Sequence, residues 1–185
     1  MDYVETVRYL YSLGNEVLTA KLGLYNISTL LKFLGSPHKR FQSILIAGTN
    51  GKGSVAAFVS STLRQSGFVT GLYTSPHLDR IEERIQIDGT KISPTDFSRI
   101  AGEIKAVIDH LMCHSPNLRG QPGLHRHPTY FEVVTAIALQ YFAEQKVKIA
   151  VLEAGLGGRL DATNVVDRVV AVITNVDLDH QRYLG

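Results

Sequence analysis

The chain has 185 residues, about the length of one domain, and can bury a core without covalent staples. Its one cysteine, Cys113, excludes an intramolecular disulfide framework, and its net charge of +2 does not indicate nucleic acid or an anionic membrane as the main partner. No run approaches the roughly 18 uncharged residues of a membrane span, and the N-terminus lacks a basic-then-apolar signal. We therefore expect a soluble, cytoplasmic protein.

Short apolar runs alternate with longer helical patterns along the chain. The runs at 44–47 and 69–74 each predict a strand, and the first ends in glycines. Between them lies a predicted helix that ends at Gly67. The residues that recur at helical spacing in it are Val55, Phe58, Val59, Thr62 and Leu63.

The pair Asp88-Gly89 stands between two short apolar segments and predicts a two-residue hairpin. Ser93 and Pro94 then begin a long amphipathic helix, with Ser93 as its N-cap. A polar loop follows at 113–128, and another helix is expected from about residue 130 to 145.

Two further strands are expected, at 148–153 and 169–174. Both are near-continuous apolar runs, which is typical of strands covered on both faces. The succession of strands and helices indicates an α/β fold with a mostly parallel sheet.

The segment GTNGKGS lies between the first strand and the first helix of this sheet, where a phosphate-binding loop belongs. Glycines let backbone N–H groups converge on phosphate oxygens, and a lysine neutralises the terminal phosphates. The loop departs from the general pattern G-x-x-x-x-G-K-[ST], because Ile46 replaces the first glycine and Gly53 separates Lys52 from Ser54. The alternative is a glycine-rich turn that merely joins strand to helix. The predicted nucleotide-binding residues are Gly48, Thr49, Asn50, Gly51, Lys52, Gly53 and Ser54.

Six ordered motifs resemble one enzyme family: GTNGKGS (48–54), YTSPHL (73–78), ERI (83–85), TYFE (129–132), LEAGLGGRLDATN (152–164) and LDHQRYLG (178–185). The chain is similar to folylpolyglutamate synthase/dihydrofolate synthase of the Mur ligase superfamily, from about residue 5 onward. In that family a glycine after the loop lysine is normal.

The resemblance implies a P-loop domain of the Mur ligase central-domain type, with helices on both faces of the sheet. It implies that residues 1–185 are an N-terminal ATP-binding domain, incomplete at its C-terminus, with the C-terminal glutamate-binding domain absent. The implied cofactors are ATP and Mg²⁺, and the implied substrates are L-glutamate with dihydropteroate or reduced folates. ATP would phosphorylate a substrate carboxylate, and the glutamate amine would attack the acyl phosphate. The family implies a monomer when complete, and we expect this chain alone to bind rather than turn over.

The resemblance places catalytic roles on Lys52 and His180, and Mg²⁺ ligands at Ser75, Glu153 and His180. These ligands follow predicted strands, where ligands gather in open α/β sheets. Serine and glutamate offer oxygens to a hard cation, whereas a histidine ligand for Mg²⁺ is less usual and rests on the family alone. From the residues alone, Ser75 could be a turn residue, Glu153 could pair with Arg159, and His180 could be a surface residue.

The resemblance also points to substrate-binding residues, which are Ser12, Asn15, His77, Thr129, Tyr130, Phe131, Glu132, Arg159 and Asp161. Thr129 and Glu132 equally fit a helix capping box, and an aromatic residue at a helix start is often core. Two other functions stay open: a Mur-type ligase that acts on a UDP-sugar precursor, and a nucleotide-binding remnant without turnover.

Overall fold

The computed structural model describes residues 1–14, 23–114 and 124–178. Their strands form one sheet in the order β4-β3-β2-β5-β1-β6. The strands are β1 (Gln42–Ala47), β2 (Thr70–Tyr73), β3 (Ile85–Ile87), β4 (Thr90–Lys91), β5 (Ile149–Glu153) and β6 (Arg168–Ile173). The strands β2, β5, β1 and β6 run parallel, and the β3–β4 hairpin adds the antiparallel edge. The predicted mostly parallel α/β sheet is confirmed.

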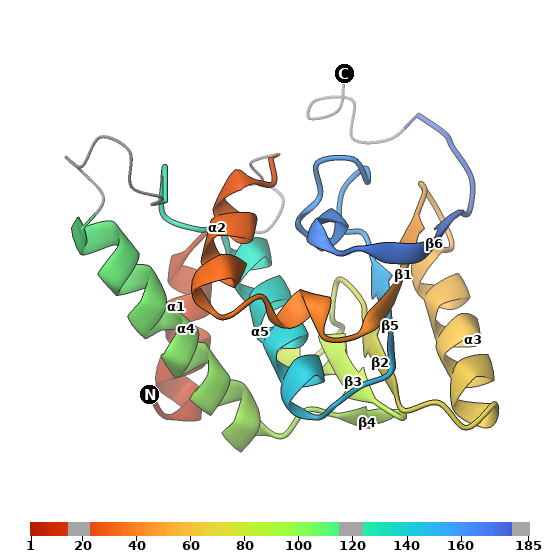
Figure 1. The fold of residues 1–185 in the computed structure, drawn as a ribbon, viewed down its shortest axis with the longest axis horizontal. Coiled ribbons are helices and arrows are strands. Elements are labelled where there is room, and N and C mark those ends of the chain that lie inside the picture. Colours follow the sequence, from red (N-terminus) through yellow and green to blue (C-terminus); the bar gives the residue numbers. More distant parts are fainter. Residues whose placement is uncertain (15–22, 115–123, 179–185) are drawn as a thin grey trace.

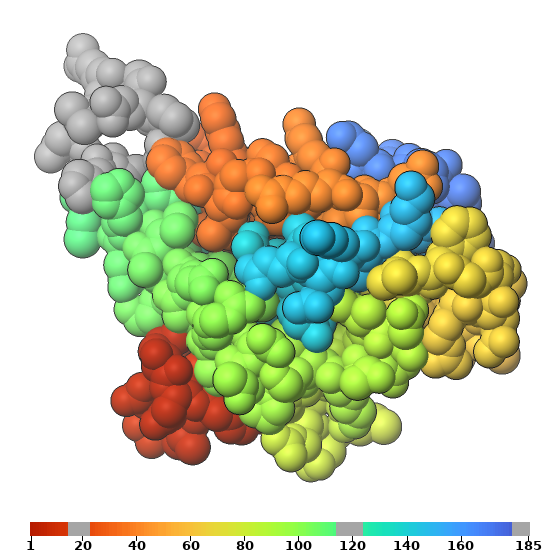
Figure 2. Space-filling view, turned by 60° about the horizontal axis from the view of Figure 1, so that its bottom comes forward, coloured from red at the N-terminus to blue at the C-terminus, as the bar shows by residue number. Residues whose placement is uncertain are grey.

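Helices cover both faces of this sheet (Figure 1). The helices are α1 (Tyr3–Ser12), α2 (Tyr25–Phe33), α3 (Lys52–Gln65), α4 (Pro94–His114) and α5 (Tyr130–Glu144), with short 3₁₀ turns η1 (Pro37–Lys39), η2 (Ile81–Arg84) and η3 (Ala162–Val165). Helix α3 packs on β1, β2 and β5, while α5 packs on β2 from the other side. Helices α4, α2 and α1 pack against α5, so that α1 lies beside α4 at the end of the molecule away from α3 (Figure 2).

The core divides into two clusters because strand side chains alternate between the faces. On the α5 side, Leu45, Tyr73 and Leu152 join the buried residues of the helices. On the α3 side, Ile46 and Val151 pack with Ala56 of the helix. Strand β5 is buried along its whole length, as its apolar sequence predicts.

Strand β6 corrects the prediction that both late strands are covered on both faces. It pairs with β1 on one side, stands at the edge of the described sheet, and leaves Val169 and Val170 exposed. Helix α3 departs in part from its predicted helical spacing of apolar residues, because Phe58 is 74% exposed while Ala56 and Ser60 are buried. Val55, Val59 and Leu63 pack against the core on the α3 side, as their spacing predicts, whereas Phe58 and Thr62 of the same predicted set are exposed.

The predicted local signals of turns and caps are confirmed. Asp88 and Gly89 both have positive φ angles (50° and 83°), as a two-residue hairpin turn requires. Ser93 Oγ accepts a hydrogen bond from the Asp96 N–H, and Gly67 follows α3 with φ 84°. Within the described ranges, none of the helices combines the length and apolarity needed to cross a lipid bilayer.

Candidate functional site

The candidate residues gather where four parallel strands end. The glycine loop follows β1, Ser75 follows β2, Glu153 is the last residue of β5, and residues 174–178 follow β6. In open α/β sheets this edge is the usual ligand site, because loops and helix N-termini converge there. Residues from four distant segments thus form one site.

The glycine loop leads directly into α3. Gly51 stands at the N-cap with φ 75°, a left-handed conformation that glycine adopts without strain. The Lys52 ammonium folds back over the loop and donates hydrogen bonds to the carbonyls of Gly48 (2.9 Å) and Thr49 (3.0 Å). Ser54 is exposed in the first turn of the helix. The loop therefore presents a cation and a helix N-terminus together, which suits an anionic ligand.

Residues 174–177 hold the loop from the side of β6, and the sequence patterns did not single them out. The Asn175 side-chain oxygen accepts from the Asn50 N–H at 2.8 Å, and the Asn175 carbonyl accepts from the Thr49 N–H at 3.0 Å. The Thr49 hydroxyl accepts from the Asp177 N–H at 3.0 Å. A Cβ on Gly48 would lie 2.2 Å from the hydroxyl of Thr174, so this contact requires glycine.

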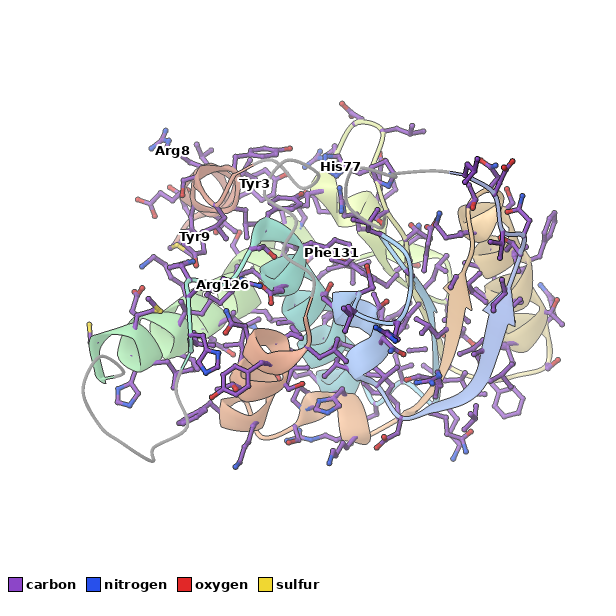
Figure 3. All side chains as sticks on the ribbon, turned by 90° about the horizontal axis from the view of Figure 1, so that it is seen from above. Tyr3, Arg8, Tyr9, His77, Arg126 and Phe131 are labelled. Carbon is purple, nitrogen blue, oxygen red and sulfur yellow. The ribbon has the colours of Figure 1, made fainter. Side chains whose placement is uncertain are left out.

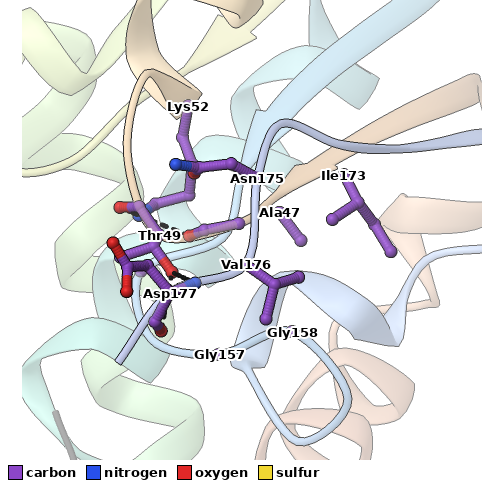
Figure 4. A pocket seen from close by; sticks show the side chains of 11 residues that line it. Ala47, Thr49, Lys52, Gly157, Gly158, Ile173, Asn175, Val176 and Asp177 are labelled. Carbon is purple, nitrogen blue, oxygen red and sulfur yellow. Dashed lines mark hydrogen bonds between the residues drawn. The ribbon is translucent and has the colours of Figure 1, made fainter. Parts of the chain in front are cut away.

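A pocket of about 300 Å³ opens between the loop and this segment (Figure 4). Its lining comes from the glycine loop, the loop after β5 and the segment after β6: Ala47, Gly48, Thr49, Lys52, Gly155, Gly157, Gly158, Ile173, Asn175, Val176 and Asp177. Four glycines and Lys52 line it together with the polar side chains of Thr49, Asn175 and Asp177, beside the apolar Ala47, Ile173 and Val176. This is the composition expected of a nucleotide phosphate site.

Glu153 is a buried carboxylate, 5% exposed, beside the start of α3. Burial raises its pKa; the Ser75 N–H, which donates to Oε2 at 3.0 Å, and the charges of Lys52 and Arg84 partly oppose that rise. A Cβ on Gly53 would come within 3.3 Å of the same carboxylate, which explains why glycine follows the lysine. Among the described residues, the cations whose charges act on Glu153 are thus Lys52 and Arg84, and not Arg159.

This carboxylate suits a hard cation, because a buried anion whose pKa is raised gains from a further positive charge. Ser75 lies next to it, as the resemblance implied. His180, the third implied ligand, lies outside the described residues. Among the residues that the structure describes, no three His, Cys, Asp or Glu side chains form a metal-binding group.

His77 follows Ser75 by two residues and belongs to a second cluster. Its Nδ1 accepts a hydrogen bond from the Arg84 Nε–H at 2.8 Å, and its Nε2 lies 3.4 Å from the Tyr11 hydroxyl. Tyr11 stacks on Tyr130, with 5.9 Å between ring centroids. Sequence reasoning missed Tyr11 and Arg84 as site residues, although Arg84 belongs to the quoted motif ERI.

The start of α5 forms the helix capping box that the TYFE motif predicts. Thr129 Oγ1 accepts from the Glu132 N–H, and Glu132 accepts from the Thr129 N–H, so the capping box is present. Glu132 also accepts two hydrogen bonds from Arg126, at 2.7 and 3.1 Å. The Phe131 ring packs against Gly155, where an added Cβ would lie 2.7 Å from the ring. Phe131, Arg126 and His77 lie on separate segments of the chain (Figure 3).

The remaining predicted residues differ in their surroundings. Asp161 is buried and accepts from the N–H groups of Leu156 and Thr163, and burial raises its pKa. Arg159 is exposed, and the Ser12 hydroxyl donates to the Tyr9 carbonyl within its own helix. Asn15 lies outside the described residues. Asp161 thus holds the loop after β5 together. Within the described part of the chain, no side-chain hydrogen bond joins Arg159 or Ser12 to the clusters above.

No family model matches the chain. Two curated relatives align over its full length: a probable bifunctional folylpolyglutamate synthase/dihydropteroate synthase of Haloferax volcanii, 43% identical, and the folylpolyglutamate synthase of Lacticaseibacillus casei, 40% identical. The chain spans 21% and 41% of their lengths.

Solved structures agree with these relatives. The folylpolyglutamate synthase of Thermotoga maritima is 45% identical with a TM-score of 0.83, over 95% of this chain and 38% of its own. An FPGS–AMPPCP–folate complex is 40% identical with a TM-score of 0.86, over 100% of this chain and 43% of its own. E. coli FolC in complex with DHPP and ADP is 36% identical with a TM-score of 0.84, over 100% of this chain and 41% of the FolC chain. The chain is therefore homologous over its full length to part of the folylpolyglutamate synthases and dihydrofolate synthases, and it spans less than half of the relatives named.

Proposed function

We propose that residues 1–185 are the ATP- and Mg²⁺-binding part of a ligase that adds L-glutamate to dihydropteroate or a reduced folate. The observation that carries this proposal is the convergence of Lys52 and the buried Glu153 on one glycine loop at the end of β1. The relatives that bind AMPPCP, ADP, DHPP and folate share this fold at 36–40% identity. Activation of a carboxylate by ATP needs positioned phosphates more than a protein nucleophile.

The nucleotide side is assigned to the glycine loop. Gly48, Thr49, Asn50, Gly51, Lys52, Gly53 and Ser54 would surround the phosphates, with Lys52 turning from the loop carbonyls to the terminal phosphate. Ser75 and Glu153 would hold Mg²⁺, together with His180 by family resemblance. When bound, that ion neutralises the charge that develops on the transferred phosphoryl group.

The acceptor side is assigned to the cluster around the start of α5. Tyr130 and Phe131 offer aromatic rings, and His77, which Arg84 joins by a hydrogen bond, offers an imidazole. Planar pteridine rings bind well to aromatic side chains, because flat rings stack with little loss of side-chain entropy. Thr129 and Glu132 would keep these rings in place through the capping box, and Asp161 would do so through the loop after β5.

The experiment measures ADP release by the complete polypeptide to which these residues belong, and not by residues 1–185 alone, with ATP, Mg²⁺ and L-glutamate. Dihydropteroate and tetrahydrofolate are offered separately as acceptors, and a UDP-muramoyl precursor serves as the control acceptor. We expect ADP release only with a pteridine acceptor and only with glutamate. Release with the UDP-sugar alone, or ATP binding without release for any acceptor, would reject the proposal. We further propose that the protein acts as a cytoplasmic monomer. Sedimentation of the purified polypeptide tests its oligomeric state.

A further inference from the structure

Arg84 is a cation that the chain buries almost completely. It is 2% exposed and ends the short helix η2. Its carbonyl accepts a hydrogen bond from the Thr74 N–H at 3.0 Å, which fastens it beside the end of β2, next to Ser75. A buried guanidinium is costly unless its surroundings are arranged around it. A role in solubility at the surface therefore does not explain why this arginine is buried.

The Arg84 side chain connects the two halves of the site. Its Nε–H donates to His77 Nδ1 at 2.8 Å, and its guanidinium carbon lies 5.4 Å from the centroid of the Tyr130 ring. Its charge also acts on Glu153, where it opposes the rise in the pKa of that carboxyl. One buried side chain thus contacts the imidazole of His77 and the ring of Tyr130, and its charge acts on Glu153.

The contact with Arg84 determines how His77 presents itself. Because Nδ1 accepts a hydrogen bond, the neutral ring carries its proton on Nε2. That nitrogen lies 3.4 Å from the Tyr11 hydroxyl, and Tyr11 is stacked on Tyr130 with 9° between the ring planes. The result is an N–H donor beside two parallel aromatic rings.

We propose that Arg84 is a positioning residue for the acceptor substrate. It holds His77 as an Nε2–H donor beside Tyr11 and Tyr130, where this donor binds the carboxylate of an acid whose planar ring lies against the aromatic side chains. The inference rests on the proposed ligase function and deepens it. Arg84 itself is buried and acts through His77.

The kinetic test compares Arg84→Lys with the same change at Arg99, an exposed arginine of α4 paired with Glu103 and Glu144. Lysine keeps the charge but lacks the Nε–H that fixes His77. We expect KM for dihydropteroate to rise about tenfold in Arg84→Lys, the usual effect of losing a hydrogen bond to a charged group. KM for ATP should change less than about twofold, and Arg99→Lys should resemble the unmodified protein.

A double-mutant cycle separates positioning from general support of the fold. His77→Asn keeps an acceptor near Nδ1 but removes the Nε2–H, so it should raise KM for dihydropteroate as Arg84→Lys does. The double variant should be no worse than either single variant, because both remove the same interaction. Effects that multiply, or equal rises in the KM values for ATP and dihydropteroate, would overturn the proposal.

A spectroscopic measurement tests the first step without any variant. The ¹⁵N spectrum of the His77 ring should show the proton on Nε2 in the unmodified protein, and a ring protonated on Nδ1 would overturn the proposal. Arg84→Lys should produce a mixture of both tautomers. Absence of turnover with every acceptor would reject the ligase function instead, and the ring spectrum together with direct binding of dihydropteroate would still decide the role of Arg84.

Discussion

The Glu153 carboxylate accepts a hydrogen bond from the Ser75 N–H at 3.0 Å, although 78 residues separate the two in the sequence. The contact exists because β2 and β5 are parallel neighbours and therefore end at the same edge of the sheet. It places two candidate metal ligands beside the start of α3, where a nucleotide phosphate would lie. The testable consequences of this arrangement begin with the lysine of the glycine loop.

Lys52→Ala should remove most nucleotide affinity and leave the fold intact. Among the described residues, the Lys52 ammonium donates hydrogen bonds to two loop carbonyls and its charge acts on Glu153, so we expect its loss to change packing little while it removes the cation of the glycine loop. We expect affinity for AMPPCP to fall at least about 100-fold, the order of one charge-assisted contact in a dry site. Calorimetric titration measures it, with Lys32→Ala on α2 as the matched control. Unchanged affinity would remove Lys52 from the phosphate site.

Gly48→Ala and Gly51→Ala should differ in stability although both glycines have positive φ. A Cβ on Gly48 would lie 2.2 Å from Thr174 Oγ1 and 2.9 Å from the Asn175 carbonyl, whereas a Cβ on Gly51 meets nothing within 4 Å. Gly51→Ala therefore costs only backbone strain, about 1 kcal/mol, and Gly48→Ala costs about 2–4 kcal/mol. Urea unfolding of both variants measures the difference. Equal losses would show that the segment after β6 does not hold the loop.

Glu83 should stabilise the loop that carries His77 in a pH-dependent manner. The Leu78 N–H, followed by those of Arg80 and Asp79, lowers its pKa from 4.5 to about 2. A carboxyl whose pKa is lowered in the folded state contributes stability above its unfolded value, and that contribution disappears as the pH falls through about 2. Glu83→Gln should therefore lower the melting temperature at pH 7. The gap to the unmodified protein should narrow below pH 4.5 and close near pH 2. A gap that is independent of pH would contradict this assignment.

Glu132→Ala should destabilise the protein more than Thr129→Ala. Both variants break the capping box of α5, which contributes about 1 kcal/mol, but only the first also removes the two hydrogen bonds that Glu132 accepts from the partly buried Arg126. We expect losses of about 3 kcal/mol and about 1 kcal/mol in the free energy of unfolding. Chemical denaturation distinguishes them. If Glu132→Ala cost no more than Thr129→Ala, capping would be the whole structural role of Glu132.

The sequence by itself determined the features that depend on near neighbours. The hairpin at Asp88-Gly89, the N-cap at Ser93 and the capping box at Thr129 follow from the conformations and hydrogen bonds of adjacent residues, and all three are present. The order of strands and helices likewise indicated the parallel sheet, because crossovers between parallel strands need long connections. The glycine loop after β1 could be recognised for the same reason.

Only the tertiary structure decided which distant residues meet. It brought Asn175 to the glycine loop and Arg84 to His77, and no spacing in the sequence indicates either pair. It also decided that β6 lies at an edge of the described sheet and that Phe58 faces outward. An apolar residue type indicates that a side chain can be buried, but not which part of the protein would cover it. Local patterns specify conformation, whereas contacts across a sheet depend on strand order and register.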